Sequence, residues 1–226
     1  MYWTEDADNT EVYQVPEDVL DIVFKIDCKQ LPNDHAWPLS QTLQAALPWL
    51  SDAPGAGIHL IHGAGSQNGW MRPEGPDDLI HLSKRARMTL RMPAERVDDV
   101  LSLQGRVLEF DAYRIGLGKA SVKPLSTYEV QFSRNVVCDS DMEEERFLEM
   151  AVEEIRKLEI KPRKLMSGMV QELRSPAGPV FTRSLMIADL EPQEAVVLQE
   201  NGLGPDRLLG CGLFVPHKGI KSSKES

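Results

Sequence analysis

The sequence contains only three cysteines among 226 residues, and it lacks any long hydrophobic run. Cys28, Cys138 and Cys211 lie far apart, and no two of them form a Cys-x-x-Cys pair. This spacing argues against a disulfide framework and against a cysteine zinc site, and it favours a reducing compartment. No apolar run is long enough to span a bilayer, and the acidic N-terminus is unlike a signal peptide. We therefore expect a cytoplasmic protein with no membrane partner.

Several nucleotide, RNA and metal motifs are also absent. The glycine-rich residues 63–69 are not followed by Lys-Ser or Lys-Thr, so they do not form a P-loop and are interpreted as an exposed connection. No Lys/Arg-Gly-Phe-x-Phe motif is present, which argues against reading of single-stranded RNA by an ordinary RNA-recognition motif. His59 and His62 have no cysteine or carboxylate cluster beside them. We expect no metal and no other cofactor.

Basic charge is scarce overall, because 25 Lys and Arg oppose 35 Asp and Glu and leave a net charge of −10. The acidic residues are concentrated in two segments. Residues 1–27 carry a net charge of about −7 and residues 139–159 about −6, so the remainder is slightly basic. Local patches rather than the total charge decide whether a protein binds nucleic acid. The distribution therefore permits RNA binding without requiring it.

Hydrophobic periodicity predicts the order strand, helix, strand, strand, helix, strand twice along the chain. In the first half we expect strands at 19–27, 57–62, 86–91 and 106–117, and helices that begin near 38 and 93. In the second half we expect strands at 128–132, 164–174, 180–187 and 208–215, and helices at 142–158 and 192–201. This order is that of the ferredoxin-like βαββαβ fold, and polar residues 118–127 separate the two halves. We expect an α+β protein with domains 1–120 and 121–226.

A glycine-rich stretch near the C-terminus, 202–219, is the most distinctive segment. It carries glycines at 202, 204, 210 and 212, one arginine at 207, and then the apolar run Leu213–Val215. A glycine-rich turn with one basic side chain and free N–H groups can hold a phosphate. The alternative is a plain helix-to-strand turn in which Gly202 caps the preceding helix.

The segment Pro205–Phe214 resembles the C-terminal motif of the CRISPR repeat-processing endoribonucleases, the Cas-six family of the RAMP superfamily. The ending Val215–Gly219 is similar to that of the branch called Cmx-six. The resemblance implies two ferredoxin-like (RRM-like) domains side by side, with the glycine-rich loop in the second. It also implies a metal-independent endoribonuclease that cuts CRISPR precursor RNA within its repeats and stays bound to its product in an interference complex.

His35 is the candidate catalytic residue. It stands just before a predicted helix, beside Asp34 and Trp37, in a loop that we expect to open toward solvent. A histidine titrates near neutral pH and can accept a proton from a hydroxyl group. A surface or capping histidine is an equally good interpretation from the sequence alone. The resemblance carries the catalytic role onto His35, because the family's catalytic histidine commonly lies in or near the first helix.

The candidate RNA-binding residues are basic side chains and glycines. Arg85, Arg87 and Arg91 share one parity, so on a strand they would form a one-sided row suited to phosphates, although a solvated face is the usual meaning of a charge run. The full predicted set is Lys84, Arg85, Arg87, Arg91, Arg163, Lys164, Arg183, Gly204, Arg207, Gly210, Gly212, His217 and Lys218.

The implied partners are a CRISPR repeat RNA hairpin and, through the resemblance, other subunits of an interference complex. The implied reaction is attack of a 2′-hydroxyl on the adjacent phosphate, with His35 as general base. Two other functions remain open: an RNA-hairpin-binding subunit without cleavage, and a ferredoxin-like regulatory or ligand-binding protein, since this fold supports many functions.

Overall fold

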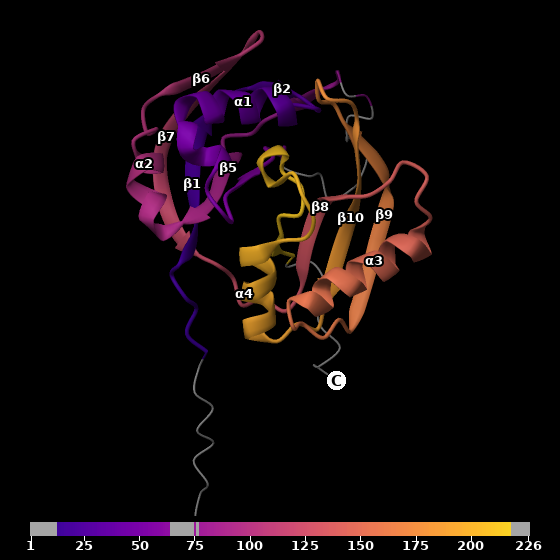
Figure 1. The fold of residues 1–226 in the computed structure, drawn as a ribbon. Coiled ribbons are helices and arrows are strands. Elements are labelled where there is room, and N and C mark those ends of the chain that lie inside the picture. The colour runs from indigo at the N-terminus through magenta and orange to yellow at the C-terminus, as the bar shows by residue number, and fades with distance from the viewer. Residues whose placement is uncertain (1–12, 64–74, 76, 218–226) are drawn as a thin grey trace, which may run out of the picture.

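The computed structural model describes residues 13–63, 75 and 77–217 as two antiparallel sheets, each with helices on one side (Figure 1). The first sheet has the order β3-β5-β1-β7-β6. Its strands are β1 (Val19–Asp27), β3 (Gly57–His59), β5 (Arg87–Pro93), β6 (Val107–Phe110) and β7 (Tyr113–Pro124). Its helical elements are α1 (Ala36–Ala46), η1 (Pro48–Ser51), η2 (Ala94–Arg96) and α2 (Val97–Leu101).

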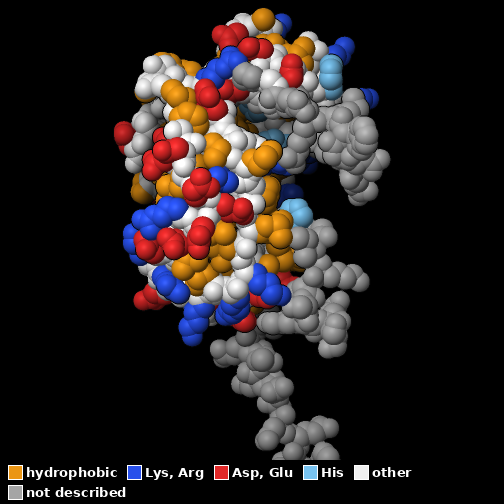
Figure 2. Space-filling model, turned by 90° about the vertical axis from the view of Figure 1, so that its right-hand side faces the viewer, with side chains coloured by type: hydrophobic (Ala, Val, Ile, Leu, Met, Phe, Trp, Pro, Cys, Tyr) orange, Lys and Arg blue, Asp and Glu red, His pale blue; other side chains and the backbone are white. Residues whose placement is uncertain are grey.

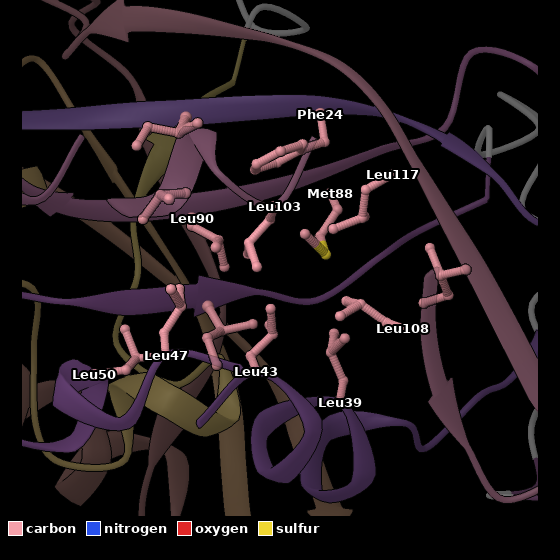
Figure 3. Packing of buried hydrophobic residues seen from close by; sticks show 14 of the residues in the cluster. Phe24, Leu39, Leu43, Leu47, Leu50, Met88, Leu90, Leu103, Leu108 and Leu117 are labelled. Atoms are coloured by element: carbon pink, nitrogen blue, oxygen red, sulfur yellow. The ribbon is translucent and has the colours of Figure 1, made fainter. Parts of the chain in front are cut away.

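The N-terminal core lies between this sheet and α1. Phe24 and Met88 point from the sheet toward Leu39 and Leu43 of α1, and all four side chains are fully buried (Figure 3). Burying a large apolar side chain contributes about 1.5–3 kcal/mol. The helical spacing of the α1 leucines and the alternation of β1 therefore specify the same core.

The second sheet has the order β11-β8-β10-β9, again with all pairs antiparallel. Its strands are β8 (Gln131–Val137), β9 (Lys164–Leu173), β10 (Val180–Ala188) and β11 (Val215–Pro216). Its helical elements are α3 (Glu144–Lys157), α4 (Pro192–Asn201) and η3 (Arg207–Leu209). Phe147 and Ile155 of α3 pack against Leu185 and Ile187 of β10.

The strand orders confirm the predicted fold. In the first sheet, with β6 left aside, β7 lies beside β1, β1 beside β5, and β5 beside β3. In the second sheet β11 lies beside β8, β8 beside β10, and β10 beside β9. Both sheets thus have the strand order 4-1-3-2. This is the ferredoxin-like arrangement of a βαββαβ chain, and it occurs twice. The first unit has β6 as an added strand, and a small separate sheet pairs β2 (Gln30–Pro32) with β4 (Leu79–His81).

The structure corrects several predicted boundaries. The last strand was expected at 208–215, but only Val215–Pro216 pairs, because the glycines before it take positive φ. The strand expected at 128–132 is Gln131–Val137. Residues 118–124, expected to separate the domains, are the second half of β7 and pair with β1 as far as Leu20 opposite Pro124. The predicted division after residue 120 therefore falls inside β7.

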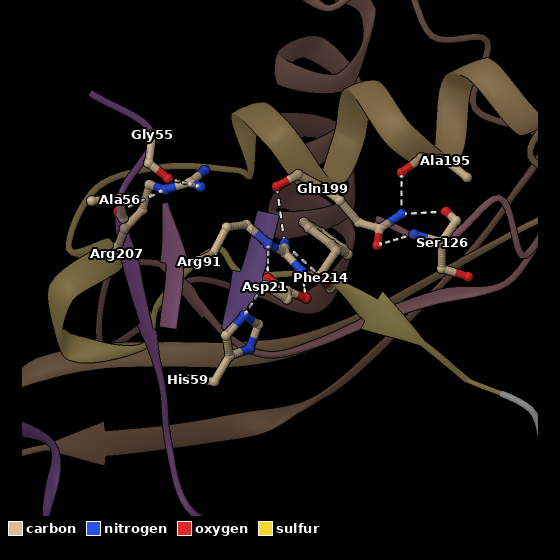
Figure 4. A network of polar contacts seen from close by, with 10 residues as sticks. All are labelled: Asp21, Gly55, Ala56, His59, Arg91, Ser126, Ala195, Gln199, Arg207 and Phe214. Carbon is tan, nitrogen blue, oxygen red and sulfur yellow. Dashed lines mark hydrogen bonds and ion pairs between the residues drawn. The ribbon is translucent and has the colours of Figure 1, made fainter. Parts of the chain in front are cut away.

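Arg91 joins the two sheets. Its side chain is fully buried on β5, where its Nε and Nη2 donate to the carboxylate oxygens of Asp21 at 2.8 and 2.9 Å (Figure 4). Its Nη1 donates to the carbonyl oxygens of Gln199 and Phe214 at 2.9 and 3.0 Å. A single guanidinium group thus links β1 to the end of α4 and to the segment before β11.

Charge and burial set the protonation states around Arg91. Burial acts to raise the pKa of Asp21, but the charge and hydrogen bonds of Arg91 outweigh it and lower that pKa. His59 lies beside them, with its Nε2 3.8 Å from an Asp21 oxygen. Burial, followed by the charge of Arg91, lowers the pKa of His59 to about 4, so its ring is neutral at pH 7.

A second contact region surrounds the glycine-rich segment. Ala36 of α1, Leu173 of β9, and Leu209 and Cys211 of the segment form a small buried cluster between the units. Gln199 fixes the connection that follows β7, because its amide accepts from the Ser126 N–H at 3.1 Å and donates to the Ser126 carbonyl at 2.5 Å. The units are therefore joined by apolar packing as well as by Arg91.

We predict that Arg91→Met destabilises the protein strongly. The substitution leaves the Asp21 carboxylate and two buried carbonyl groups without their donor, and breaking a buried ion pair in this way costs about 3–5 kcal/mol. Urea unfolding measures the loss. Arg96→Met is the matched control, because Arg96 forms an ion pair with Asp99 whose side chains are 43% and 46% exposed. The control is expected to lose less than about 1 kcal/mol; equal losses would contradict the bridging role of Arg91.

We also predict that stability falls as the pH is lowered from about 6.5 toward 4. In this window the unfolded chain protonates His59 whereas the folded chain does not, so His59 favours the unfolded state by up to about 3 kcal/mol. Urea unfolding at a series of pH values measures the slope. His59→Gln is expected to make it shallower, and an unchanged slope would show that His59 is not held neutral.

Candidate functional site

A surface depression of about 430 Å³ lies between α1, η1 and the glycine-rich segment. It is lined by Trp37 and Gln44 of α1, by Ser51 at the end of η1, by Gly55 after it, and by residues 204–209. The depression combines one aromatic ring, several hydrogen-bonding groups and the arginine at 207. These are the groups that can hold a nucleotide: a planar ring for a base, and N–H donors for a phosphate.

The glycine-rich segment is a tightly closed turn. Gly202, Gly204, Gly210 and Gly212 all have positive φ between 65° and 82°. A Cβ on Gly202 would collide with the Gly212 carbonyl, and one on Gly212 with the Leu203 carbonyl. Only glycine fits these two positions, where the backbone also closes on itself through the Leu203 N–H and the Gly212 carbonyl at 3.1 Å.

This closure limits which predicted glycines can meet a phosphate. The N–H of Gly210 donates to the Arg207 carbonyl at 3.1 Å, and that of Gly212 to the Asn135 carbonyl at 2.6 Å. Both N–H groups are therefore engaged within the protein, and the predicted contact of these glycines with RNA stays a prediction. Gly204 is exposed at the tip of the turn, with no atom within 4 Å of the position of a Cβ.

Arg207 fastens the turn to the first unit. Its Nη2 donates to the Gly55 carbonyl at 2.7 Å and its Nε to the Ala56 carbonyl at 3.3 Å (Figure 4). Within the described part of the chain its buried Nη1 has no hydrogen-bond partner. Burial lowers the pKa of Arg207 to about 10, so it remains charged at pH 7. Arg207 thus lies at the edge of the depression with one donor still unused.

His35 is buried, and the expectation that it lies in a loop open to solvent is wrong. Only 1% of the residue is exposed. Its Nδ1 donates to the Pro32 carbonyl at 2.9 Å, and its Nε2 accepts from the Ile61 N–H at 3.0 Å. Both hydrogen bonds fit one neutral tautomer, and burial lowers the pKa of His35. The apolar neighbours Leu31 and Ala36 were the sequence signal for this burial.

The predicted arginine row on the third strand does not form. Lys84 and Arg85 are exposed but precede β5, which begins at Arg87. Arg87 turns back to donate to the Lys84 and Ala86 carbonyls at 3.0 and 2.7 Å. Arg91 is buried between the units and cannot reach RNA, so its predicted RNA contact is wrong. Lys84 and Arg85 are the members of this set that stand in solvent.

The basic residues of the second unit hold its own structure. Arg163 pairs with Glu194 at 2.6 Å, and Lys164 with Asp189 at 2.9 Å. Arg183 donates to the Gly168 and Met142 carbonyls, each at 2.8 Å. The charges of Arg163 and Lys164 are therefore paired with carboxylates, whereas Arg183 keeps its charge and is held by carbonyl groups. His217 lies edge-on against Phe132 with ring centroids 5.6 Å apart, and Lys218 lies outside the described residues.

One clamp between the units was missed by the sequence reasoning. The Arg174 backbone N–H, at the end of β9, donates to Asp34 Oδ2 at 2.7 Å. The Arg174 guanidinium group donates to both Asp77 oxygens at 2.8 and 3.0 Å. The hairpin of β9 and β10 is thereby tied to the loop that carries His35. No local pattern links positions so far apart in the sequence.

Metal and membrane features can be assessed for the described residues. Among residues 13–63, 75 and 77–217, no group of three or more His, Cys, Asp and Glu side chains is arranged to hold a metal ion. Within the same ranges, no helix is both long enough and apolar enough to cross a bilayer. The features of the candidate site are therefore the glycine-rich turn, the depression beside α1 and the buried His35.

Comparisons with known proteins agree with this fold. A curated relative, the CRISPR-associated endonuclease Cas6 of Myxococcus xanthus, is 28% identical over 87% of this chain and 81% of its own length. A solved structure from work on a Cas6-related gene of Pyrococcus furiosus has a TM-score of 0.61 at 15% identity, covering 89% of this chain and all of that one. A RAMP protein described as binding different RNA substrates has a TM-score of 0.55 at 14% identity, covering 87% and 98%. The family model described as Cas6 Crispr matches residues 20–219. Since that match spans both ferredoxin-like units and the glycine-rich turn, the chain belongs to the Cas6 family.

Proposed function

We propose that this protein is an endoribonuclease that cuts CRISPR precursor RNA within its repeats to give guide RNA, and that it does so without a metal ion. The observation that carries the proposal is the family match across residues 20–219, together with the curated relative that is named as an endonuclease. Retention of the product and association with subunits of an interference complex belong to the same proposal.

The depression between α1 and the glycine-rich turn is the proposed place of the RNA backbone. Gly204 is exposed in the turn, and Arg207 supplies a positive charge at the edge of the depression while its Nε and Nη2 hold the Ala56 and Gly55 carbonyls. Trp37 supplies a ring on the facing side for a base. Such preorganised donors stabilise the charge that develops on a phosphate during the reaction.

The proposed chemistry is attack of the 2′-hydroxyl oxygen on the adjacent phosphorus. The bond to the 5′ oxygen of the next nucleotide breaks and that oxygen takes up a proton from water, which leaves a 2′,3′-cyclic phosphate and a 5′-hydroxyl group. We assign removal of the 2′-hydroxyl proton to His35, as the resemblance implies. Because Nε2 of His35 accepts from the Ile61 N–H and the ring is buried, this role requires that hydrogen bond to open when RNA binds.

The burial of His35 also favours a second candidate function. A histidine with both ring nitrogens engaged is typical of a structural residue, which fits a subunit that binds the RNA hairpin without cutting it. The two functions differ in one measurable respect, the appearance of cleavage products.

We predict that the wild-type protein cuts a labelled repeat hairpin from its own locus in the presence of EDTA. His35→Ala is expected to lower the cleavage rate by at least about 100-fold while it binds the uncut hairpin with nearly unchanged affinity. Gel analysis of the products measures the cleavage rate, and phosphatase and kinase treatment identifies the cyclic phosphate and the 5′-hydroxyl. A gel-shift assay with the uncut hairpin measures the affinity. His59→Gln, which changes another largely enclosed histidine, is the matched control and should cut normally.

Each other outcome is informative. Cleavage by both wild type and His35→Ala would leave the enzyme class standing and move the catalytic base elsewhere. Tight binding with no cleavage by the wild type would identify a binding subunit. Absence of RNA binding at moderate salt would refute the proposal and leave a regulatory or ligand-binding protein.

We predict that the double variant Lys84→Ala/Arg85→Ala binds the hairpin more weakly, because both side chains stand in solvent and can meet phosphates. The dependence of log affinity on log salt concentration should become shallower by about one to two units. Lys164→Ala is the matched control, because Lys164 already pairs with Asp189 at 2.9 Å. A control that lost as much affinity as the double variant would place the RNA on the other unit.

A further inference from the structure

An apolar row crosses the face of the second sheet that points away from α3. In the strand register Met166 of β9 is opposite Met186 of β10, Met186 is opposite Phe132 of β8, and Phe132 is opposite Val215 of β11. The neighbouring residue on β10, Ile187, points to the other face and is buried against α3. Side chains alternate along a strand, so the four residues of the row share the open face.

The row is accessible in the described structure. Met166 is 63% exposed and Val215 is 36% exposed, while Phe132 and Met186 are partly exposed. Met169, farther along the edge strand β9, is 84% exposed. Figure 2 views the molecule from the side of α3 and β9, toward the edge of the sheet rather than onto its open face, and shows hydrophobic side chains interspersed with acidic and basic ones. A contiguous exposed apolar patch with polar residues at its rim is a feature of interaction sites.

Phe132 at the centre of the row has polar neighbours that suit a nucleobase. The guanidinium carbon of Arg134 lies 5.8 Å from the Phe132 ring centroid. The His217 ring meets Phe132 at 65°, and no described residue hydrogen-bonds its buried Nδ1. An aromatic ring with an arginine and a second ring beside it is the arrangement on which unpaired bases stack.

We propose that this open sheet face, formed by Met166, Met186, Phe132 and Val215 with Arg134 and His217, binds an unpaired segment of RNA. The bases stack on Phe132 and lie along the two methionines, while Arg134 and His217 contact the backbone or base edges. Phe132 and Met186 stand on the two central strands of the sheet, β8 and β10. The proposal rests on the proposed RNA-directed function and adds a surface separate from the depression beside α1.

The test uses three labelled RNAs and fluorescence anisotropy. One is the repeat hairpin with a blunt stem, and the others carry an unpaired extension of roughly six to ten nucleotides on the 5′ or the 3′ side. A 2′-deoxy nucleotide at the mapped cut position prevents cleavage. The wild type is expected to bind at least one extended RNA about tenfold more tightly than the blunt hairpin. Phe132→Leu is expected to remove most of that gain, and Arg134→Gln part of it, because stacking on one ring is worth about 5- to 100-fold in affinity.

The blunt hairpin reports whether each variant still folds, because its binding should be unchanged. Val122→Ala is the matched control, since Val122 is an apolar residue 41% exposed on a strand of the other unit. If neither extension strengthens wild-type binding, or if Phe132→Leu binds the extended RNA as the wild type does, the sheet face does not hold RNA and is left to a protein partner. If no RNA binds at all, the proposed function itself fails.

Discussion

The buried guanidinium group of Arg91 is the constraint on which the two-domain arrangement depends. It sits on a strand of the first sheet, yet two of its four hydrogen bonds go to carbonyl groups of the second unit. A buried charge of this kind tolerates only a geometry that satisfies all of its donors. The Arg91–Asp21 pair therefore fixes where the end of α4 and the segment before β11 must lie. That placement brings the glycine-rich turn against α1 and creates the depression between them.

The glycine-rich turn forms one side of the depression that is the candidate RNA site. Positive φ at Gly202 and Gly212 folds the segment back on itself, and Arg207 then reaches the carbonyl groups beyond η1. The turn is thus built mainly from its own hydrogen bonds, and it presents a small part of itself to a ligand. Most of the described basic residues that were predicted to bind RNA instead hold carbonyl groups or carboxylates of the protein itself. Lys84 and Arg85, from the same predicted set, are exposed.

The sequence predicted the fold well because local patterns carry it. The amphipathic helix at 142–158, the hairpin around 175–179 and the cap at Gly202 are all determined by neighbours in the chain, and the structure has each of them. The prediction of the last strand at 208–215 is wrong, because Gly210 and Gly212 take positive φ and interrupt the extended backbone. Only Val215 and Pro216 pair with β8.

The candidate site was less predictable because it depends on tertiary contacts. The alternation of side chains along a strand predicted that Arg91 shares an exposed face with Arg85 and Arg87. The second unit packs over that face and buries Arg91. His35 was expected in solvent, but it is buried, and the N–H of Ile61, 26 residues away, donates to its ring. Arg174 clamps Asp77 across 97 residues, which no spacing rule could indicate. The Phe132 surface likewise exists only through the pairing of four strands.

The most direct test of this account is a map of where bound repeat RNA touches the protein. Ultraviolet cross-linking of the uncut hairpin, followed by mass spectrometry of the linked peptides, supplies that map. The account predicts cross-links in the tip of the glycine-rich turn at 204–209 and on the facing side of α1. Cross-links confined to the basic residues at 163–164 and 183, with none at the turn or at α1, would contradict it.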